Sequence, residues 1–112
     1  MRTKANGLTL EKDWSQQVYD AARQLGWLSY RVLRSKGSTP GVPDLLLLKP
    51  PRLIFAELKD EKAKPRDSQI LWLETLAEIE GVETFVWRPQ DWDMVLAILN
   101  GAMVVDDESE AA

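Results

Sequence analysis

Three charged residues, Asp44, Glu57 and Lys59, lie within or directly beside two apolar segments, and this feature constrains the chain more than any other. The segments are 45–48, which consists of four leucines, and 53–58. Both have the length and composition of buried strands, and a pair of prolines between them predicts a turn. A charged group inside an apolar sheet costs several kcal/mol unless a partner or a metal ion compensates it. The sequence therefore requires that something compensates these three charges.

The spacing of the charged residues suggests what compensates them. Glu57 and Lys59 are two residues apart and share one face of a strand, while Ala56 and Leu58 point to the other face. If the chain reverses at the proline pair, Asp44 lies roughly opposite Glu57, so two carboxylates and one ammonium group converge. Carboxylate oxygens suit Mg²⁺ or Mn²⁺, and a water on such an ion can act as a nucleophile. A lysine there can orient that water or stabilise the charge on a phosphate group.

Length and composition bound the class of protein. The chain has 112 residues, 45% of them hydrophobic, which fits one domain with its own core. We expect 1–100 to form that domain and 101–112 to be an acidic, disordered tail. The absence of cysteine and histidine excludes disulfides, thiol chemistry, zinc sites built on these residues and histidine bases. No apolar segment approaches about 18 residues and no signal peptide begins the chain, so we expect a cytoplasmic protein with no membrane partner.

The net charge of −4 is unusual for a protein that binds nucleic acid, but the charge is unevenly distributed. Residues 1–66 contain 13 Lys and Arg against 7 Asp and Glu, whereas residues 67–112 contain 1 against 11. The basic part includes Asp44, Glu57 and Lys59, so a cationic surface around these residues is one interpretation. A solvated surface of mixed charge is the other, and the charge pattern alone favours neither.

Hydrophobic periodicity and turn residues predict seven elements. Trp14 belongs to the apolar stripe of the first helix, which Gly26 ends, and is expected in the core. Asp67 or Ser68 is expected to cap the second helix, whose apolar stripe begins at Ile70. The apolar composition of the two strands beside the proline pair predicts that both are central and covered on both faces. The expected elements are a helix over 10–25, strands over 27–33, 43–49 and 52–59, a helix over 67–80, a strand over 82–87 and a helix from Gln90 or Asp91 to about 100.

The arrangement resembles the PD-(D/E)xK nuclease superfamily, with Pro43-Asp44 and Glu57-Leu58-Lys59 in the positions of its motif. Within it, the chain is most similar to the VRR-NUC, or virus-type replication-repair nuclease, domains. Those domains carry Gly-x-Pro-Asp before one strand, Glu-Leu-Lys at the end of the next and a glutamine on the following helix, here Gln69. The Trp87-Arg88-Pro89 strand exit comes in the same order. Many relatives have a histidine where Tyr30-Arg31 stands here, so no role of such a histidine transfers to this chain.

The resemblance implies an α/β fold with a restriction-endonuclease-like αβββαβ core, in which helices flank a four-stranded mixed sheet, plus a C-terminal helix. It also implies a metal-dependent endonuclease that hydrolyses phosphodiester bonds of DNA with Mg²⁺ or Mn²⁺. The implied catalytic residues are Asp44, Glu57, Lys59 and Gln69. The implied metal ligands are Asp44, Glu57 and the main-chain carbonyl of Leu58.

Relatives often place a further acid from the first helix near the metal. Glu11 is the first candidate in this chain, ahead of Gln17 and Asp20. An acid in the first turn equally complements the helix dipole, so both interpretations of Glu11 stay open.

Two basic loops are candidates for contact with the DNA backbone, which supplies most of the affinity for nucleic acid. The candidate nucleic-acid-binding residues are Arg34, Lys36, Lys62, Lys64 and Arg66. So small a domain offers little surface to a duplex, so we expect a homodimer that acts on branched, junction or flap DNA. The similarity to virus-type nucleases suggests phage or prophage replication, repair or recombination. No glycine-rich phosphate loop occurs, and we expect no organic cofactor.

Two other functions remain open from the sequence. The chain could be a non-catalytic nucleic-acid-binding module that retains the nuclease fold, although Asp44, Glu57 and Lys59 are all present. It could also be a structural domain in which Asp44 caps a turn and Glu57 pairs with Lys59 or Lys62. An exposed pair of that kind contributes little to stability.

Overall fold

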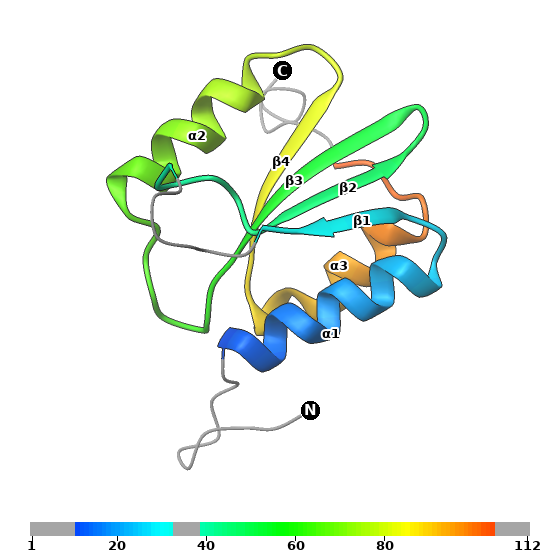
Figure 1. Ribbon diagram of the computed structural model, residues 1–112. Helices are drawn as coiled ribbons and strands as arrows, with labels where there is room; N and C mark the ends of the chain where they lie inside the picture. The colour runs from blue at the N-terminus through cyan, green and yellow to red at the C-terminus, as the bar shows by residue number, and fades with distance from the viewer. Residues whose placement is uncertain (1–10, 33–38, 105–112) are drawn as a thin grey trace, which may run out of the picture.

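The fold is a four-stranded sheet with helices on both faces (Figure 1). The computed structural model describes residues 11–32 and 39–104, with the side chains of Glu11 and Lys12 left out of the description. Its elements are α1 (Glu11–Gln24), β1 (Leu28–Arg31), β2 (Leu45–Lys49), β3 (Arg52–Leu58), α2 (Asp67–Ala77), β4 (Val82–Trp87), the 3-10 turn η1 (Pro89–Asp91) and α3 (Trp92–Leu99). This order agrees with the predicted sequence of elements, and none of the helices among the described residues is long and apolar enough to cross a membrane.

The sheet has the strand order β1-β2-β3-β4 and is mixed. The β1–β2 and β2–β3 pairings are antiparallel, as a hairpin requires, and the Pro50-Pro51 pair forms the β2–β3 turn. β3 and β4 are parallel because α2 carries the chain across one face of the sheet between them. The hairpin and the four-stranded mixed sheet predicted from the sequence are therefore confirmed.

The hydrophobic core fills the space between the sheet and the pair α1 and α3. Two buried indoles within it satisfy their N–H groups on backbone carbonyls: Trp14 donates to Trp87 and Trp27 donates to Leu99, both at 2.9 Å. These bonds join the first helix to the end of β4, and the residue before the first strand to the end of α3. The core residues are Trp14, Val18, Ala22, Trp27, Leu45, Leu47, Ile54, Ala56, Leu58, Trp87, Val95, Ile98 and Leu99. The prediction that Trp14 is a core residue is confirmed.

The second helix begins at Asp67, as predicted, but differs from its prediction in its last residue and in its N-cap residue. α2 ends at Ala77 rather than at residue 80. Its N-cap residue is Arg66, and neither Asp67 nor Ser68 takes that position, because the Gln69 side chain accepts the Arg66 backbone N–H and satisfies the end of the helix. Ile70 is 38% exposed, so the predicted apolar stripe does not begin there.

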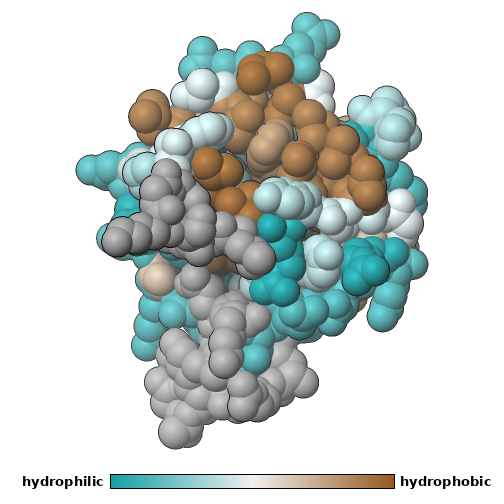
Figure 2. All heavy atoms as spheres, in the orientation of Figure 1, coloured by the Kyte–Doolittle hydropathy of each residue, from teal (hydrophilic) through white to brown (hydrophobic). Residues whose placement is uncertain are grey.

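The prediction that β2 is covered on both faces is wrong. Leu45 and Leu47 are fully buried against the helices α1 and α3, but Leu46 and Leu48 on the opposite face are only half-buried. α2 packs over β3 and β4 and leaves β1 and β2 open on this side. Apolar side chains consequently reach the surface over these strands (Figure 2).

Candidate active site

The strand register brings Asp44 and Glu57 to opposite positions. Leu45 pairs with Ala56, so the next residue on each strand places Asp44 across from Glu57. The backbone carbonyl of Asp44 also accepts the Val32 N–H at 2.8 Å, which extends the pairing between β1 and β2 by one position. Opposite residues of an antiparallel pair point to the same face, so both carboxylates lie on one side of the sheet, as the spacing predicts.

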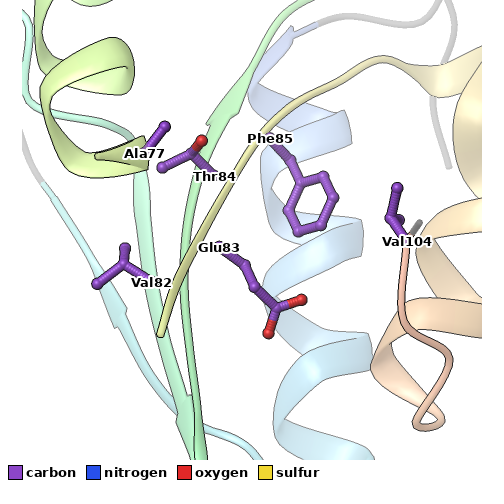
Figure 3. Close-up of a pocket in the computed structure, with 6 residues that line it drawn as sticks. All are labelled: Ala77, Val82, Glu83, Thr84, Phe85 and Val104. Carbon is purple, nitrogen blue, oxygen red and sulfur yellow. The ribbon is translucent and has the colours of Figure 1, made fainter. Parts of the chain in front are cut away.

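That side is the face covered by α2. Ala56 and Leu58 belong to the core beneath α1, whereas Glu57 contacts Gln69 of α2 and Lys59 lies beside it. The alternation along β3 therefore separates the apolar residues from the charged ones, and the prediction from the spacing is confirmed. The same alternation is visible on β4, where Val82 and Thr84 point towards Ala77 of α2 and Glu83 and Phe85 point to the other side (Figure 3).

Glu57 is a fully buried carboxylate with two charge-assisted contacts to the same oxygen. Its Oε2 atom accepts the Gln69 Nε2 hydrogen at 2.8 Å and lies 3.3 Å from the Lys59 Nζ atom. Lys59 is itself 7% exposed and Gln69 is fully buried. A buried charge costs several kcal/mol without such partners, so Lys59 and Gln69 are what make Glu57 tolerable inside the protein.

Asp44 is fixed by the strand that carries Glu57. Its Oδ2 atom accepts the Leu58 backbone N–H at 2.9 Å. The N–H and C=O groups of one strand residue point to the same neighbour, so the Leu58 carbonyl faces the side of Asp44 as well. The Lys59 N–H bonds the Trp87 carbonyl on the opposite side at 3.1 Å, as this alternation requires. Two carboxylates and one main-chain carbonyl are thus presented from adjacent strand ends.

Gly41 allows α2 to approach the segment that carries Asp44. Its φ angle is +96°, a region that disfavours residues with a side chain, and a Cβ atom there would lie 2.5 Å from the Ser68 carbonyl oxygen. The same Cβ would lie 2.9 Å from Trp72. The first residue of the Gly-x-Pro-Asp motif therefore has a packing role, because it lets the start of α2, with Gln69, lie against the site.

Gln69 has both ends of its amide group engaged. Its Nε2 donates to Glu57, and its Oε1 accepts the Arg66 N–H at 2.7 Å at the start of α2. These two contacts hold the amide in place, so Gln69 fixes the orientation of the Glu57 carboxylate.

Arg88 is a residue near the site whose role the sequence did not reveal. Its guanidinium Nη1 donates to the carbonyls of Asp60 at 2.8 Å and Ala63 at 2.6 Å, and the Asp60 carboxylate accepts the N–H groups of Lys62 and Ala63. These bonds hold the loop that follows Lys59 against the end of β4. The only sequence signal for it was the position of the arginine in the Trp-Arg-Pro strand exit.

The remaining predicted site residues divide into two groups. Lys62, Lys64 and Arg66 are exposed on the loop between β3 and α2, as phosphate contacts require. Arg34, Lys36 and the Glu11 side chain lie outside the described residues. Gln17 is half-buried on α1, and Asp20 is exposed and accepts the Gln16 amide at 2.8 Å rather than contacting Asp44 or Glu57.

A second carboxylate–cation pair lies at the other end of β3. Two guanidinium nitrogens of Arg52 contact the two oxygens of Glu83, with Nε to Oε2 at 2.8 Å, and Arg52 Nη1 also donates to the Ile98 carbonyl. The hydrogen bond with Glu83 raises the pKa of the Arg52 guanidinium. Glu83 also lines the hollow of about 270 Å³ at the free edge of β4 (Figure 3), but its engagement with Arg52 makes it a structural residue.

Within the described residues, no cluster of three or more Asp, Glu, His or Cys side chains could hold a metal ion. The donor set at the end of β3 is smaller: two carboxylates and a carbonyl. A scan of protein-family models gives no match to the chain, and searches of curated proteins and of solved structures return no significant similarity.

Proposed function

We propose that the chain is a metal-dependent DNA endonuclease of the PD-(D/E)xK type. The observation that carries the proposal is the position of Asp44 and Glu57 directly beyond the Leu45–Ala56 pair of β2 and β3, with Lys59 against the buried Glu57. Two carboxylates from adjacent strands and a lysine beside one of them stand next to a basic loop, and this set of residues suits a phosphodiester hydrolase that uses a divalent cation.

The residues present fit a hard divalent cation. Asp44, Glu57 and the Leu58 carbonyl supply oxygen donors only, which suits Mg²⁺ or Mn²⁺ rather than zinc. The remaining coordination positions would hold water, as Mg²⁺ usually requires. When bound, the cation supplies Lewis acidity and a water that is more acidic than bulk water.

The protein residues themselves have three roles in the proposed reaction. Asp44 and Glu57 hold the negative potential that attracts the cation, and Gln69 keeps Glu57 in one orientation. Lys59 extends from the same face and carries a positive charge towards the phosphate, where it stabilises the charge that develops during in-line attack. The burial of Glu57 excludes water and strengthens each of these interactions.

The proposed substrate is DNA, with branched, junction or flap structures preferred and phage or prophage replication, repair or recombination as the setting. Lys62, Lys64 and Arg66 are exposed on the loop directly after Lys59, where they can contact phosphates next to the reacting one. Arg88 supports this proposal because it holds that loop in place.

A cleavage assay tests the proposal. Labelled duplex, flap and four-way-junction DNA are incubated with Mg²⁺ or Mn²⁺, and the variants Asp44→Asn and Lys59→Met are compared with Asp93→Asn, an exposed aspartate on α3. We expect cutting that needs the metal, falls about a thousand-fold in the first two variants and is unchanged in the third, since roughly 4 kcal/mol of transition-state stabilisation is lost.

The other outcomes separate the alternatives. DNA binding by a folded protein without cutting would support the non-catalytic module. Neither binding nor cutting would support a structural domain. Cutting that survives Asp44→Asn would place the active site elsewhere.

A further inference from the structure

Two arginines from different elements contact one tyrosine ring at the edge of the sheet. Arg23 follows Tyr19 by one turn of α1, and its guanidinium carbon lies 5.4 Å from the centre of the ring. Arg31 ends β1, and its guanidinium carbon lies 5.3 Å from the same centre. α1 and β1 run side by side at this edge (Figure 1). We name these three residues the α1–β1 flank.

Neither arginine of the flank is neutralised by a carboxylate. The ion pairs of the described residues lie at the two ends of β3 and include neither of them. Arg31 instead donates from Nη1 to the Gln16 Oε1 atom at 2.7 Å, and Gln16 Nε2 donates to the Asp20 carboxylate at 2.8 Å. A neutral amide therefore separates Arg31 from that acid. Two like charges are held beside one ring, and an added polyanion would stabilise them.

The flank differs from the arginines that have structural contacts. Arg52 contacts both oxygens of Glu83, and Arg88 donates to two backbone carbonyls. In the flank, Arg23 is exposed, and Arg31 uses one nitrogen for a side-chain amide, so guanidinium N–H groups remain available to a ligand. The ring and the amide hold the two cations in place without neutralising their charge.

We infer that the α1–β1 flank binds the phosphodiester backbone of a nucleic acid. Guanidinium groups match the oxygens of a phosphate group. A phosphodiester chain is charged at every nucleotide, so one molecule contacts both arginines and relieves the repulsion between them. A hollow of about 310 Å³ lies beside Arg23 and is lined by Asp20, Arg23 and Gln24. This hollow gives a phosphate group room to reach Arg23, while the charge of Asp20 limits the affinity.

The position of the flank favours a nucleic acid over an acidic protein. Arg31 pairs with Leu45, the residue after Asp44, so the flank lies at the end of the sheet that holds the candidate site. Arg31 shares the α1 face of the sheet with the buried Leu45, whereas Asp44 is on the α2 face. A long polyanion that leaves the candidate site over the edge strand β1 therefore reaches the flank.

The flank also completes a set of cations on both sides of Asp44. The strand order places β1 on one side of β2 and β3, with the loop that carries Lys62 and Lys64, on the other. A nucleic acid engaged at both surfaces has arms that leave the site in two directions, as branched DNA does. The choice of DNA as the polyanion rests on the proposed function.

Fluorescence anisotropy on the full chain in EDTA tests the inference, with labelled duplex and four-way-junction DNA over a range of salt. Arg23→Gln/Arg31→Gln should bind the junction roughly ten-fold more weakly at low salt, and the slope of log affinity against log salt should fall by about 2. Asp20→Asn should bind more tightly. Lys49→Gln is the matched control and should bind as the wild type does, because Lys49 is exposed and its ammonium group bonds the Leu25 carbonyl.

A second variant separates charge from packing. Arg23→Lys/Arg31→Lys keeps both charges, so it should retain the slope of the wild type, and circular dichroism checks that each variant is folded. Equal slopes in the wild type and the folded glutamine variant would overturn the inference. A lysine variant with the low slope of the glutamine variant would also overturn it, since the arginines would then serve to pack α1 against β1.

Competition identifies the class of partner. Poly-glutamate of matched charge should displace the labelled DNA much less well than unlabelled DNA does. If poly-glutamate binds as tightly as DNA, and the glutamine variant loses only that binding, the flank serves an acidic protein and the inference is overturned. If the slope falls in the glutamine variant but the wild type cuts no DNA with Mg²⁺ or Mn²⁺, only the proposed function fails, because anisotropy in EDTA measures binding without cutting.

Discussion

The two ends of β3 each hold a carboxylate beside a cation, but they arrange charge in different ways. At the start of the strand, Arg52 contacts both oxygens of Glu83, so one positive and one negative group match each other. At its end, Lys59 lies 3.3 Å from Glu57, and the register adds Asp44 on the same face. The first arrangement joins one carboxylate to one guanidinium group, whereas the second has two carboxylates on adjacent strands beside a lysine.

This difference separates a structural ion pair from a candidate reaction site. A bidentate arginine pair is pre-organised and complete, and its benefit is stability. A carboxylate pair with a single lysine gains further stability from an added cation, and the cation brings chemistry with it. The two ends of β3 should therefore respond differently to loss of a cationic side chain, loss of an orienting group, loss of charge and addition of salt.

Removal of the cationic side chain at either end of β3 should have the largest effect on stability and should distinguish the two ends. Lys59→Met and Arg52→Met each leave a largely buried carboxylate without its cation, so each should lose about 3 kcal/mol of unfolding free energy in EDTA. Added Mn²⁺ should restore much of the loss only in Lys59→Met, because the carboxylate pair at that end can bind it. Urea unfolding with and without Mn²⁺ measures both effects. Equal responses of the two variants to Mn²⁺ would remove the distinction between the ends.

Loss of the orienting amide should weaken metal binding at the site end. In Gln69→Leu, nothing holds the Glu57 carboxylate in one orientation, so the affinity for Mn²⁺ should fall by about 10- to 100-fold. Isothermal titration calorimetry gives the affinity directly. Gln16→Leu, on the exposed side of α1, is the matched control and should bind as the wild type does. Unchanged affinity in Gln69→Leu would mean that Glu57 is not a ligand or that Gln69 does not orient it.

Neutralisation of Glu83 should affect stability and leave DNA cutting intact. Glu83→Gln weakens two charge-assisted hydrogen bonds and should cost roughly 1–3 kcal/mol of unfolding free energy. The pKa of Arg52 is raised in the folded protein, so its contribution to the free energy of unfolding is fully present below the pKa that Arg52 has in the unfolded chain. The contribution is lost only as pH rises past the pKa of Arg52 in the folded protein. Arg52 therefore keeps its charge across neutral and mildly alkaline pH. Thermal unfolding and cleavage rates below the melting temperature, followed over that range, test both statements. A large loss of cutting in this variant would place Glu83 in the site.

Loss of exposed lysines should produce the smallest effect, a weaker salt dependence of DNA binding, and only at the end of β3 that carries the candidate site. Lys62→Gln/Lys64→Gln removes two exposed charges next to the site, so the slope of log affinity for DNA against log salt should fall by about 2. Lys49→Gln, at the opposite end of the β2–β3 hairpin, is also exposed and should leave the slope unchanged. Fluorescence anisotropy in EDTA measures binding without cutting. Equal slopes in all three proteins would exclude this loop from the DNA contact.

Local rules were sufficient for the strands and for the positions of the charged groups. The alternation of Ala56, Glu57, Leu58 and Lys59 assigns each side chain to a face, and a hairpin centred on the proline pair fixes Asp44 opposite Glu57. These conclusions need only the two-residue period of a strand and the register of a short turn. The helix ends were predicted less well, because Gln69 rather than Asp67 or Ser68 satisfies the start of α2.

The partners of the site residues could not be found in the same way. Gln69 and Arg88 act on groups 12 to 28 positions away in the chain, and such contacts depend on how whole elements pack. The part of the sheet that α2 covers is another feature that the sequence did not predict. The apolar sequence of β2 predicted burial on both faces, but a helix of 11 residues spans only part of a four-stranded sheet and leaves Leu46 and Leu48 partly in water.

The sequence by itself determined which residues carry charge into the sheet and which face they share, because backbone geometry sets alternation and register over a few residues. Only the tertiary structure decided that Gln69 fixes Glu57, that Arg88 holds the loop after Lys59 and that β1 and β2 keep one apolar face exposed. The physical reason is that these features arise at contacts between separate elements, and the free energy of packing the whole domain determines which elements come into contact.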